Sequence, residues 1–191
     1  MYTEVLKEDF SGIRIELIDL NTSTYFYVTK ANRFKYLFQN TTRKFVIEEF
    51  TSLRYLENGI ILHLTKLDDE KAEYSFQTIL KKLNKLSVDQ KKLKILTKRI
   101  KQYRQKINFL KNEHRNLRIA HLNTLKYPEI DDFLNFEEKL KPLILEANEI
   151  GDFLFNKKLG YRFKLGSLEG YLDYRKPLEK MEIDFKSTDE L

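Results

Sequence analysis

The chain has 191 residues, 41% of them hydrophobic, and its 35 Lys and Arg against 29 Asp and Glu give a net charge of +6. It contains no cysteine, which excludes disulfides, thiolate metal sites and cysteine nucleophiles. Its apolar runs, such as residues 59–62, are far shorter than a membrane span, and residues 1–10 lack a hydrophobic stretch of signal-peptide length. We therefore expect a soluble, cytoplasmic protein with no membrane contact.

The composition favours helices. Three Pro and six Gly are few for this length, and Leu, Lys, Glu and Asn are abundant. A chain of this size supports one well-buried domain. We expect an all-α, up-and-down helical bundle with one long central helix, formed by residues 1–181 and followed by an acidic tail at 182–191.

The first predicted element covers residues 11–39. Apolar residues keep a helical spacing there, with an irregularity at residues 21–24. A β-hairpin that turns at Asn21 is the alternative, because residues 13–17 alternate in polarity and residues 24–29 are β-branched or aromatic. The pattern leaves both structures open.

Two further helices are predicted before the central one. The second begins after the Asn-Thr-Thr turn at 40–42 and ends at Asp68 and Asp69. Its expected buried side is Phe45, Ile47, Phe50, Leu53, Leu56, Ile60, Leu64 and Leu67. The third covers residues 72–83 and is expected to bury Phe76, Ile79, Leu80 and Leu83.

Residues 87–123 have the most regular pattern in the chain and predict the central helix. Ser87 as N-cap and Gln90 three residues later form a capping box. The apolar stripe alternates steps of three and four residues along Leu93, Leu96, Ile100, Tyr103, Ile107, Leu110, His114, Leu117 and His121. Two histidines thus take stripe positions where aliphatic residues are expected.

Positive charge is concentrated on this segment. Residues 81–126 contain eleven Lys and four Arg against only Asp89 and Glu113, a net charge of +13. A basic helix face is commonly just solvated, whereas such a one-sided face also suits a phosphate backbone. The candidate nucleic-acid contacts are Lys91, Lys94, Lys98, Arg99 and Lys101.

After residue 126 the Tyr127-Pro128 step predicts an extended turn. Asn135 as N-cap opens a last helix that is expected to reach about residue 158, with a kink at Pro142 and a stop at Gly160. Residues 161–174 are expected to form a short helix or an irregular arm.

The candidate catalytic residues are Arg115, Asn116 and His121. The sequence Arg-Asn-x-x-x-Ala-His, late in a long helix of a compact helical chain, resembles the HEPN superfamily of nucleases, most closely its AbiU-like abortive-infection branch. That branch also has an acidic residue closing an early helix, as Asp68 does here. Asn123 stands where AbiU-like members often carry an acid and the HepT branch a tyrosine, so the resemblance implies neither group there.

The resemblance implies a metal-independent endoribonuclease without a cofactor, acting on RNA as a symmetric homodimer. It further implies a toxin or phage-defence effector, with an antitoxin or a neighbouring defence protein as partner. Cleavage by the RNA's own 2′-hydroxyl needs a base, an acid and positive charge on the phosphorane. In a dimer one copy of His121 can take the proton of the 2′-hydroxyl and the other can give a proton to the leaving oxygen. Arg115 can bind the phosphate, and Asn116 can orient the histidine or a phosphate oxygen.

The geometry of the motif allows two arrangements. In an unbroken α-helix residues 115 and 121 lie about 120° apart around the axis. Either the helix breaks or bends near residues 116–120, so that Arg115 and His121 converge, or the working cluster is His114, Arg118 and His121, which share a face. We expect the first arrangement, with His114 and Arg118 as further contributors.

Two non-enzymatic alternatives remain open. In one, the scaffold is a helical module that binds nucleic acid or a partner protein without cleaving it. In the other, the chain is a purely structural dimer whose seam includes His114 and His121. Of these, only the first predicts an affinity for RNA that falls with salt.

Overall fold

The computed structural model describes residues 6–86, 89–120 and 133–179. Within residues 116–120 and at positions 163, 165, 172, 177 and 179 it describes the backbone alone. The elements are α1 (Lys7–Asn40), α2 (Arg43–Leu67), α3 (Phe76–Lys85), α4 (Gln90–Phe109), a π-helix (Leu110–Ala120), a π-helical turn (Phe136–Leu140), α5 (Lys141–Phe155), β1 (Tyr161–Leu165), β2 (Leu168–Leu172) and a 3₁₀ turn (Lys176–Glu179). The predicted all-α bundle is confirmed.

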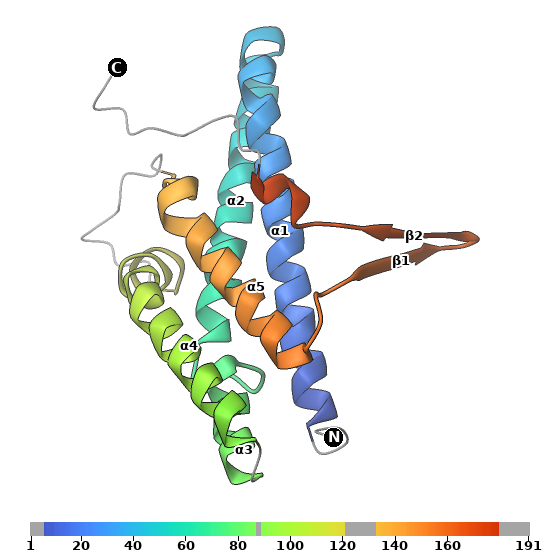
Figure 1. Ribbon diagram of the computed structural model, residues 1–191. Coiled ribbons are helices and arrows are strands. Elements are labelled where there is room, and N and C mark those ends of the chain that lie inside the picture. Colours follow the sequence, from blue (N-terminus) through green and yellow to red (C-terminus); the bar gives the residue numbers. More distant parts are fainter. Residues whose placement is uncertain (1–5, 87–88, 121–132, 180–191) are drawn as a thin grey trace.

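The two longest helices, α1 and α2, run side by side as a helical hairpin, α5 packs across them, and α4 packs against α5 and α3 (Figure 1). The α1–α2 pair organises the bundle, whereas α4, predicted to be central, lies at its edge (Figure 1). No helix in the described part of the chain is both long and apolar enough to span a bilayer.

The N-terminal segment is one helix, so the β-hairpin alternative is wrong. The polar residues that suggested a turn are satisfied within the helix. The Asn21 amide donates to the Leu17 carbonyl at 2.7 Å, and its side chain exchanges two 2.8 Å hydrogen bonds with Asn148 of α5. The Thr24 hydroxyl donates to the Leu20 carbonyl at 2.8 Å. Tertiary pairing of buried amides therefore overrides the local turn signal.

The predicted buried side of α2 is correct only beyond its first turns. Leu53, Ile60 and Leu64 are fully buried, whereas Phe45 and Ile47 are 49% and 55% exposed. The tip of the α1–α2 hairpin extends past the other helices (Figure 1), so the bundle leaves about half of each of these two side chains exposed. The periodicity identified the helix but not how far the bundle covers it.

The apolar stripe of α4 is buried as predicted, at Leu93, Leu96, Ile100, Tyr103, Ile107 and Leu110. Its N-cap is Asp89, whose carboxylate accepts from the backbone N–H groups of Lys91 and Lys92; the predicted cap, Ser87, lies outside the described residues. From Leu110 the helix continues with π winding, in which each N–H bonds five residues back. This winding brings the rings of Phe109 and His114, five residues apart, edge to face at 6.4 Å.

The last helix is capped by Asn135 as predicted, through its side chain and the Glu138 N–H. Pro142 lies in the first turn of α5, directly after the π-helical turn Phe136–Leu140. The change of winding at this point allows the helix to continue past a residue that has no N–H. The helix ends at Phe155, with Asn156 in the left-handed conformation (φ 53°), so the predicted stop at Gly160 is wrong. The Tyr127-Pro128 turn and the tail at 182–191 lie outside the described residues.

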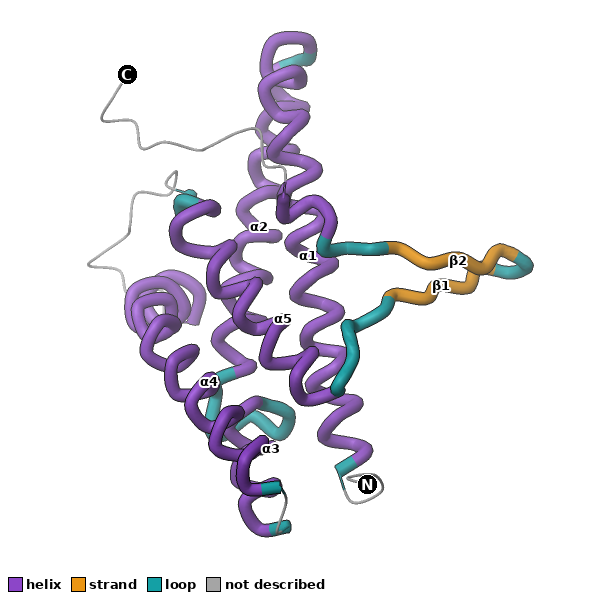
Figure 2. Tube along the Cα trace, viewed as in Figure 1, coloured by secondary structure: helices purple, strands orange, loops and turns teal. Residues whose placement is uncertain are grey.

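Residues 161–172 form an antiparallel β-hairpin, where the sequence predicted a helix or an irregular arm. Tyr161 pairs with Leu172 and Leu165 with Leu168, around a turn in which Gly166 has a φ of 60°. A positive φ at this position suits glycine because it has no Cβ. The hairpin projects away from the helices (Figure 2), and the Tyr161 ring at its base packs edge to face on Tyr174 at 4.8 Å.

Candidate nucleic-acid interface

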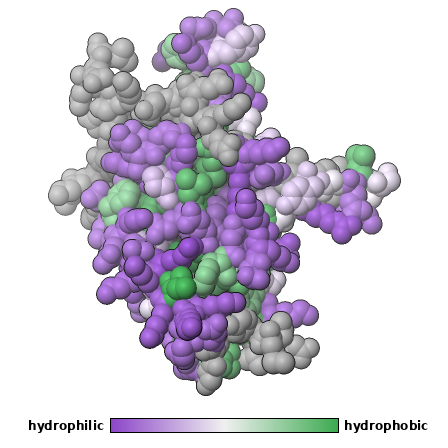
Figure 3. All heavy atoms as spheres, viewed as in Figure 1, coloured by the Kyte–Doolittle hydropathy of each residue, from purple (hydrophilic) through white to green (hydrophobic). Residues whose placement is uncertain are grey.

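The basic residues of α4 fall on three different faces of the helix. Four of them share the outward face, opposite the buried stripe, because they recur at steps of three and four residues. We call these the lysine ladder: Lys91, Lys94, Lys98 and Lys101. All four are exposed and form no ion pair with any carboxylate that the structure describes. The surface over α4 and α5 is mainly hydrophilic (Figure 3).

Arg99 and Lys106 lie on a second face, which is turned toward α5. The Lys106 ammonium is 2.7 Å from the Glu146 carboxylate, and an Arg99 guanidinium nitrogen is 3.9 Å from Glu149. The Arg99 guanidinium also lies over the Phe153 ring, 5.3 Å from its centre. Arg99 was predicted as a nucleic-acid contact together with the lysines of the ladder. The structure places it in the α4–α5 contact, so it does not belong to the lysine ladder.

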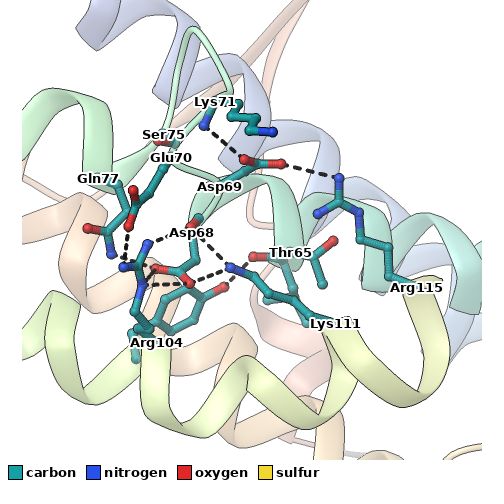
Figure 4. Close-up of polar contacts among 12 residues, drawn as sticks. Thr65, Asp68, Asp69, Glu70, Lys71, Ser75, Gln77, Arg104, Lys111 and Arg115 are labelled. Atoms are coloured by element: carbon teal, nitrogen blue, oxygen red, sulfur yellow. Dashed lines mark hydrogen bonds and ion pairs between the residues drawn. The ribbon is translucent and has the colours of Figure 1, made fainter. Parts of the chain in front are cut away.

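A third face meets the acidic junction, which we define as Asp68, Asp69 and Glu70 at the C-terminal end of α2. Asp68 is fully buried, and its carboxylate accepts hydrogen bonds from Lys111 at 2.5 Å, from Gln77 at 2.6 Å and from Arg104 at 3.3 Å. Figure 4 shows Arg104 and Lys111 both pointing toward it. The Arg104 guanidinium also reaches Glu70 at 2.5 Å. The junction therefore fixes α4 and the start of the π-helix against α2.

Arg115 is the motif residue whose side chain the structure describes. Its Nη2 donates to the Asp69 carboxylate at 3.2 Å, and the side chain is 33% exposed (Figure 4). The backbone N–H of Lys71 and the Arg115 guanidinium lower the pKa of Asp69 below its usual value, although partial burial opposes them. Arg115 is thus held at the junction through one nitrogen, close to the end of α2.

For the other residues of the motif the structure gives the backbone of residues 116–120 and the side chain of His114. The backbone of Asn116 and Arg118 lies in the π-helix, which continues through residues 116–120 without a break. His114 is half-buried against Phe109, while His121 and Asn123 lie outside the described residues. The helix therefore does not break where the sequence predicted it, and the winding changes from α to π earlier, at Leu110. Among the described residues no group of three His, Cys, Asp or Glu side chains could hold a metal.

The sequence analysis did not predict the ion pairs that join the basic segment to the end of α2. In these pairs Arg104 and Lys111 bind the Asp68 carboxylate. The signal was present, because three consecutive carboxylates at 68–70 lie close in sequence to a segment with a net charge of +13. An acidic turn and a basic helix in one compact chain are expected to pair. Of the segment's eleven Lys and four Arg, four pair with this turn in the described structure: Lys81, Arg104, Lys111 and Arg115. The lysine ladder pairs with no described carboxylate.

Replacing Asp68 with asparagine is expected to destabilise the fold by about 3 kcal/mol, because the partly buried cations of Arg104 and Lys111 lose their shared counter-ion. Urea unfolding followed by circular dichroism measures this loss. The matched control is Asp69→Asn, which removes a more exposed carboxylate with one arginine partner and is expected to cost about 1 kcal/mol. Equal losses in the two variants would contradict the structural role of Asp68.

The junction also predicts acid sensitivity. The Lys71 N–H lowers the pKa of Asp69, and the Arg104 hydrogen bond lowers that of Glu70. A carboxyl group whose pKa is lower in the folded state than in the unfolded state stabilises the fold at pH values above its unfolded-state pKa. That contribution is lost as the pH falls through the folded-state pKa. Urea midpoints should therefore drop below about pH 4, and an Asp69→Asn, Glu70→Gln double variant should lose less over this range. An equal loss of stability in both proteins would contradict the acidic junction as the source of the acid sensitivity.

Comparison with known protein families, with curated proteins and with solved structures finds no match for this chain.

Proposed function

We propose that this protein is a metal-independent endoribonuclease of the HEPN type, which acts as a homodimer in toxicity or phage defence. The observation that carries the proposal is the lysine ladder. Four exposed lysines, free of described carboxylates, follow the same continuous helix that carries the Arg115 motif. A phosphate backbone bound along α4 would be led toward that motif.

The spacing of the ladder suits this role. Steps of three and four residues correspond to a rise of about 5 Å along the helix axis. Lysine is a flexible point charge that neutralises phosphates without reading sequence. The ladder would therefore bind RNA of many sequences, and any choice of cleavage site would come from elsewhere.

The environment of Arg115 is compatible with phosphate binding. A guanidinium has five N–H donors, and the contact with Asp69 uses one of them. The side chain is one-third exposed, so donors remain for a phosphate oxygen. In the proposed homodimer His121 of each protomer supplies one of the two proton-transfer groups, and Asn116 orients a histidine or the phosphate.

A second function is supported by the ion pair itself. Because Arg115 is bound to Asp69 of its own chain, the helix also fits a protein that holds RNA on the ladder without cleaving it. In that case Arg115 belongs to the acidic junction, and the motif has no chemical role. The two functions share the ladder and differ in the fate of the RNA.

Incubation of an end-labelled mixed RNA with the purified protein at low salt, in EDTA, separates these functions. Shortened RNA on a denaturing gel is the result expected of the endoribonuclease. Intact RNA that is retarded on a native gel would support the binding protein instead. RNA that stays intact and is not retarded would contradict both functions. The remaining alternative would then be a purely structural dimer, and light scattering would measure its mass.

A further inference from the structure

A small apolar cavity lies where four helices meet, at the opposite end of α4 from the Arg115 motif. Its volume is about 150 Å³. The first turn of α1 contributes Phe10, the end of α3 contributes Leu83, α4 contributes Leu93 and Leu96, and the end of α5 contributes Phe155. The three leucines are almost fully buried, so they form the closed side. An apolar cavity of about this volume holds a benzene-sized molecule.

The open side of the cavity is polar. Lys92 and Asn156 line it, and both are exposed. The Lys92 ammonium forms no ion pair with a carboxylate in the described ranges. The nearest acidic residue in sequence, Asp89, is engaged by the backbone N–H groups of α4, and Asp9 of α1 is paired with Lys82. The cavity thus combines an apolar interior with a free positive charge at its entrance.

We propose that this cavity binds a small carboxylate with a compact apolar body, such as an aromatic acid. The apolar body fills the space between the leucines and Phe10, and the carboxylate accepts a charge-assisted hydrogen bond from Lys92. Lys92 lies in the first turn of α4, where the helix dipole also favours an anion. The site is independent of the proposed cleavage of RNA, because it uses neither the lysine ladder nor the motif.

Benzoate is the probe for this site, with methyl-labelled leucine in the full chain as the reporter. Benzoate is expected to shift the methyl signals of Leu83, Leu93 and Leu96 saturably, with a Kd on the order of 1 mM for so small a ligand. Lys92→Gln should weaken benzoate about fivefold. The matched control Lys91→Gln changes the neighbouring lysine, which belongs to the ladder, and should leave the affinity unchanged.

Comparison of probes on the unaltered protein adds a test that needs no variant. Benzyl alcohol has a similar shape without the charge and should bind more weakly than benzoate. Benzylammonium carries the opposite charge and should bind weakest of the three. Unshifted signals of these leucines, equal benzoate affinity with and without the Lys92 ammonium, or benzylammonium binding as tight as benzoate would each overturn the proposal.

Discussion

His121→Ala is expected to lower the rate of RNA cleavage by about 10²–10⁴-fold, because the variant dimer lacks both groups that would transfer protons to and from the RNA. RNA affinity should stay within about twofold, since the ladder supplies the phosphate contacts. Single-turnover cleavage with protein in excess measures the first quantity, and a filter-binding titration measures the second. A split between rate and affinity is the expected signature of a catalytic group.

The matched control is His63→Gln. His63 lies on α2 and bonds the Glu16 carboxylate of α1 at 2.6 Å, so it belongs to the α1–α2 contact and not to the motif. This variant should cleave RNA at the rate of the unaltered protein. Equal rates for all three proteins would remove His121 from the chemistry and leave the Arg-to-His spacing without a function.

Replacing the lysine ladder with glutamine at Lys91, Lys94, Lys98 and Lys101 is expected to weaken RNA binding by about 10²–10³-fold at 0.1 M salt. Each phosphate contact to single-stranded RNA contributes a slope of about −0.7 to the dependence of log affinity on log salt. Four contacts give a slope of about −3, which the variant should lose. Fluorescence anisotropy at several salt concentrations measures both quantities.

The control for this variant removes the same charge elsewhere. Lys7, Lys35, Lys44 and Lys164 are exposed and lie on α1, α2 and the β-hairpin. Changing these four to glutamine gives the same net charge as the ladder variant, yet should retain most of the affinity and the salt slope. Equal weakening by the two quadruple variants would show that RNA responds to overall charge and that α4 is not the binding face.

Local periodicity predicted the helices after residue 42 but left the N-terminal one open, and it did not predict which neighbours cover each helix. The spacing of Leu93 to Leu110 identified the buried side of α4 because that side faces the bundle along its whole length. The same reasoning failed at Phe45 and Ile47, where the hairpin of α1 and α2 extends beyond its neighbours. It also missed the β-hairpin at 161–172, whose strands are short and whose turn depends on a single glycine at positive φ.

Long-range pairs account for the remaining differences. In the sequence Asn21 is typical of a turn, but in the structure its amide hydrogen-bonds to Asn148, 127 positions away, and it lies within a helix. Arg99 resembles a member of the ladder until α5 places Glu149 and Phe153 beside it. The candidate site shows the same limit, because the spacing of Arg115 indicated a motif and gave no sign of Asp69. Such partners depend on which helices become neighbours, and a pattern within one helix does not contain that information.

The end groups of RNA cleaved in EDTA test the central proposal most directly. The purified protein is incubated with a defined RNA in EDTA, and the fragments are analysed by mass spectrometry. The proposed metal-independent attack of the 2′-hydroxyl predicts 2′,3′-cyclic phosphate ends on the upstream fragments and 5′-hydroxyl ends on the downstream ones. Intact RNA in EDTA, or fragments with 5′-phosphate ends, would contradict it.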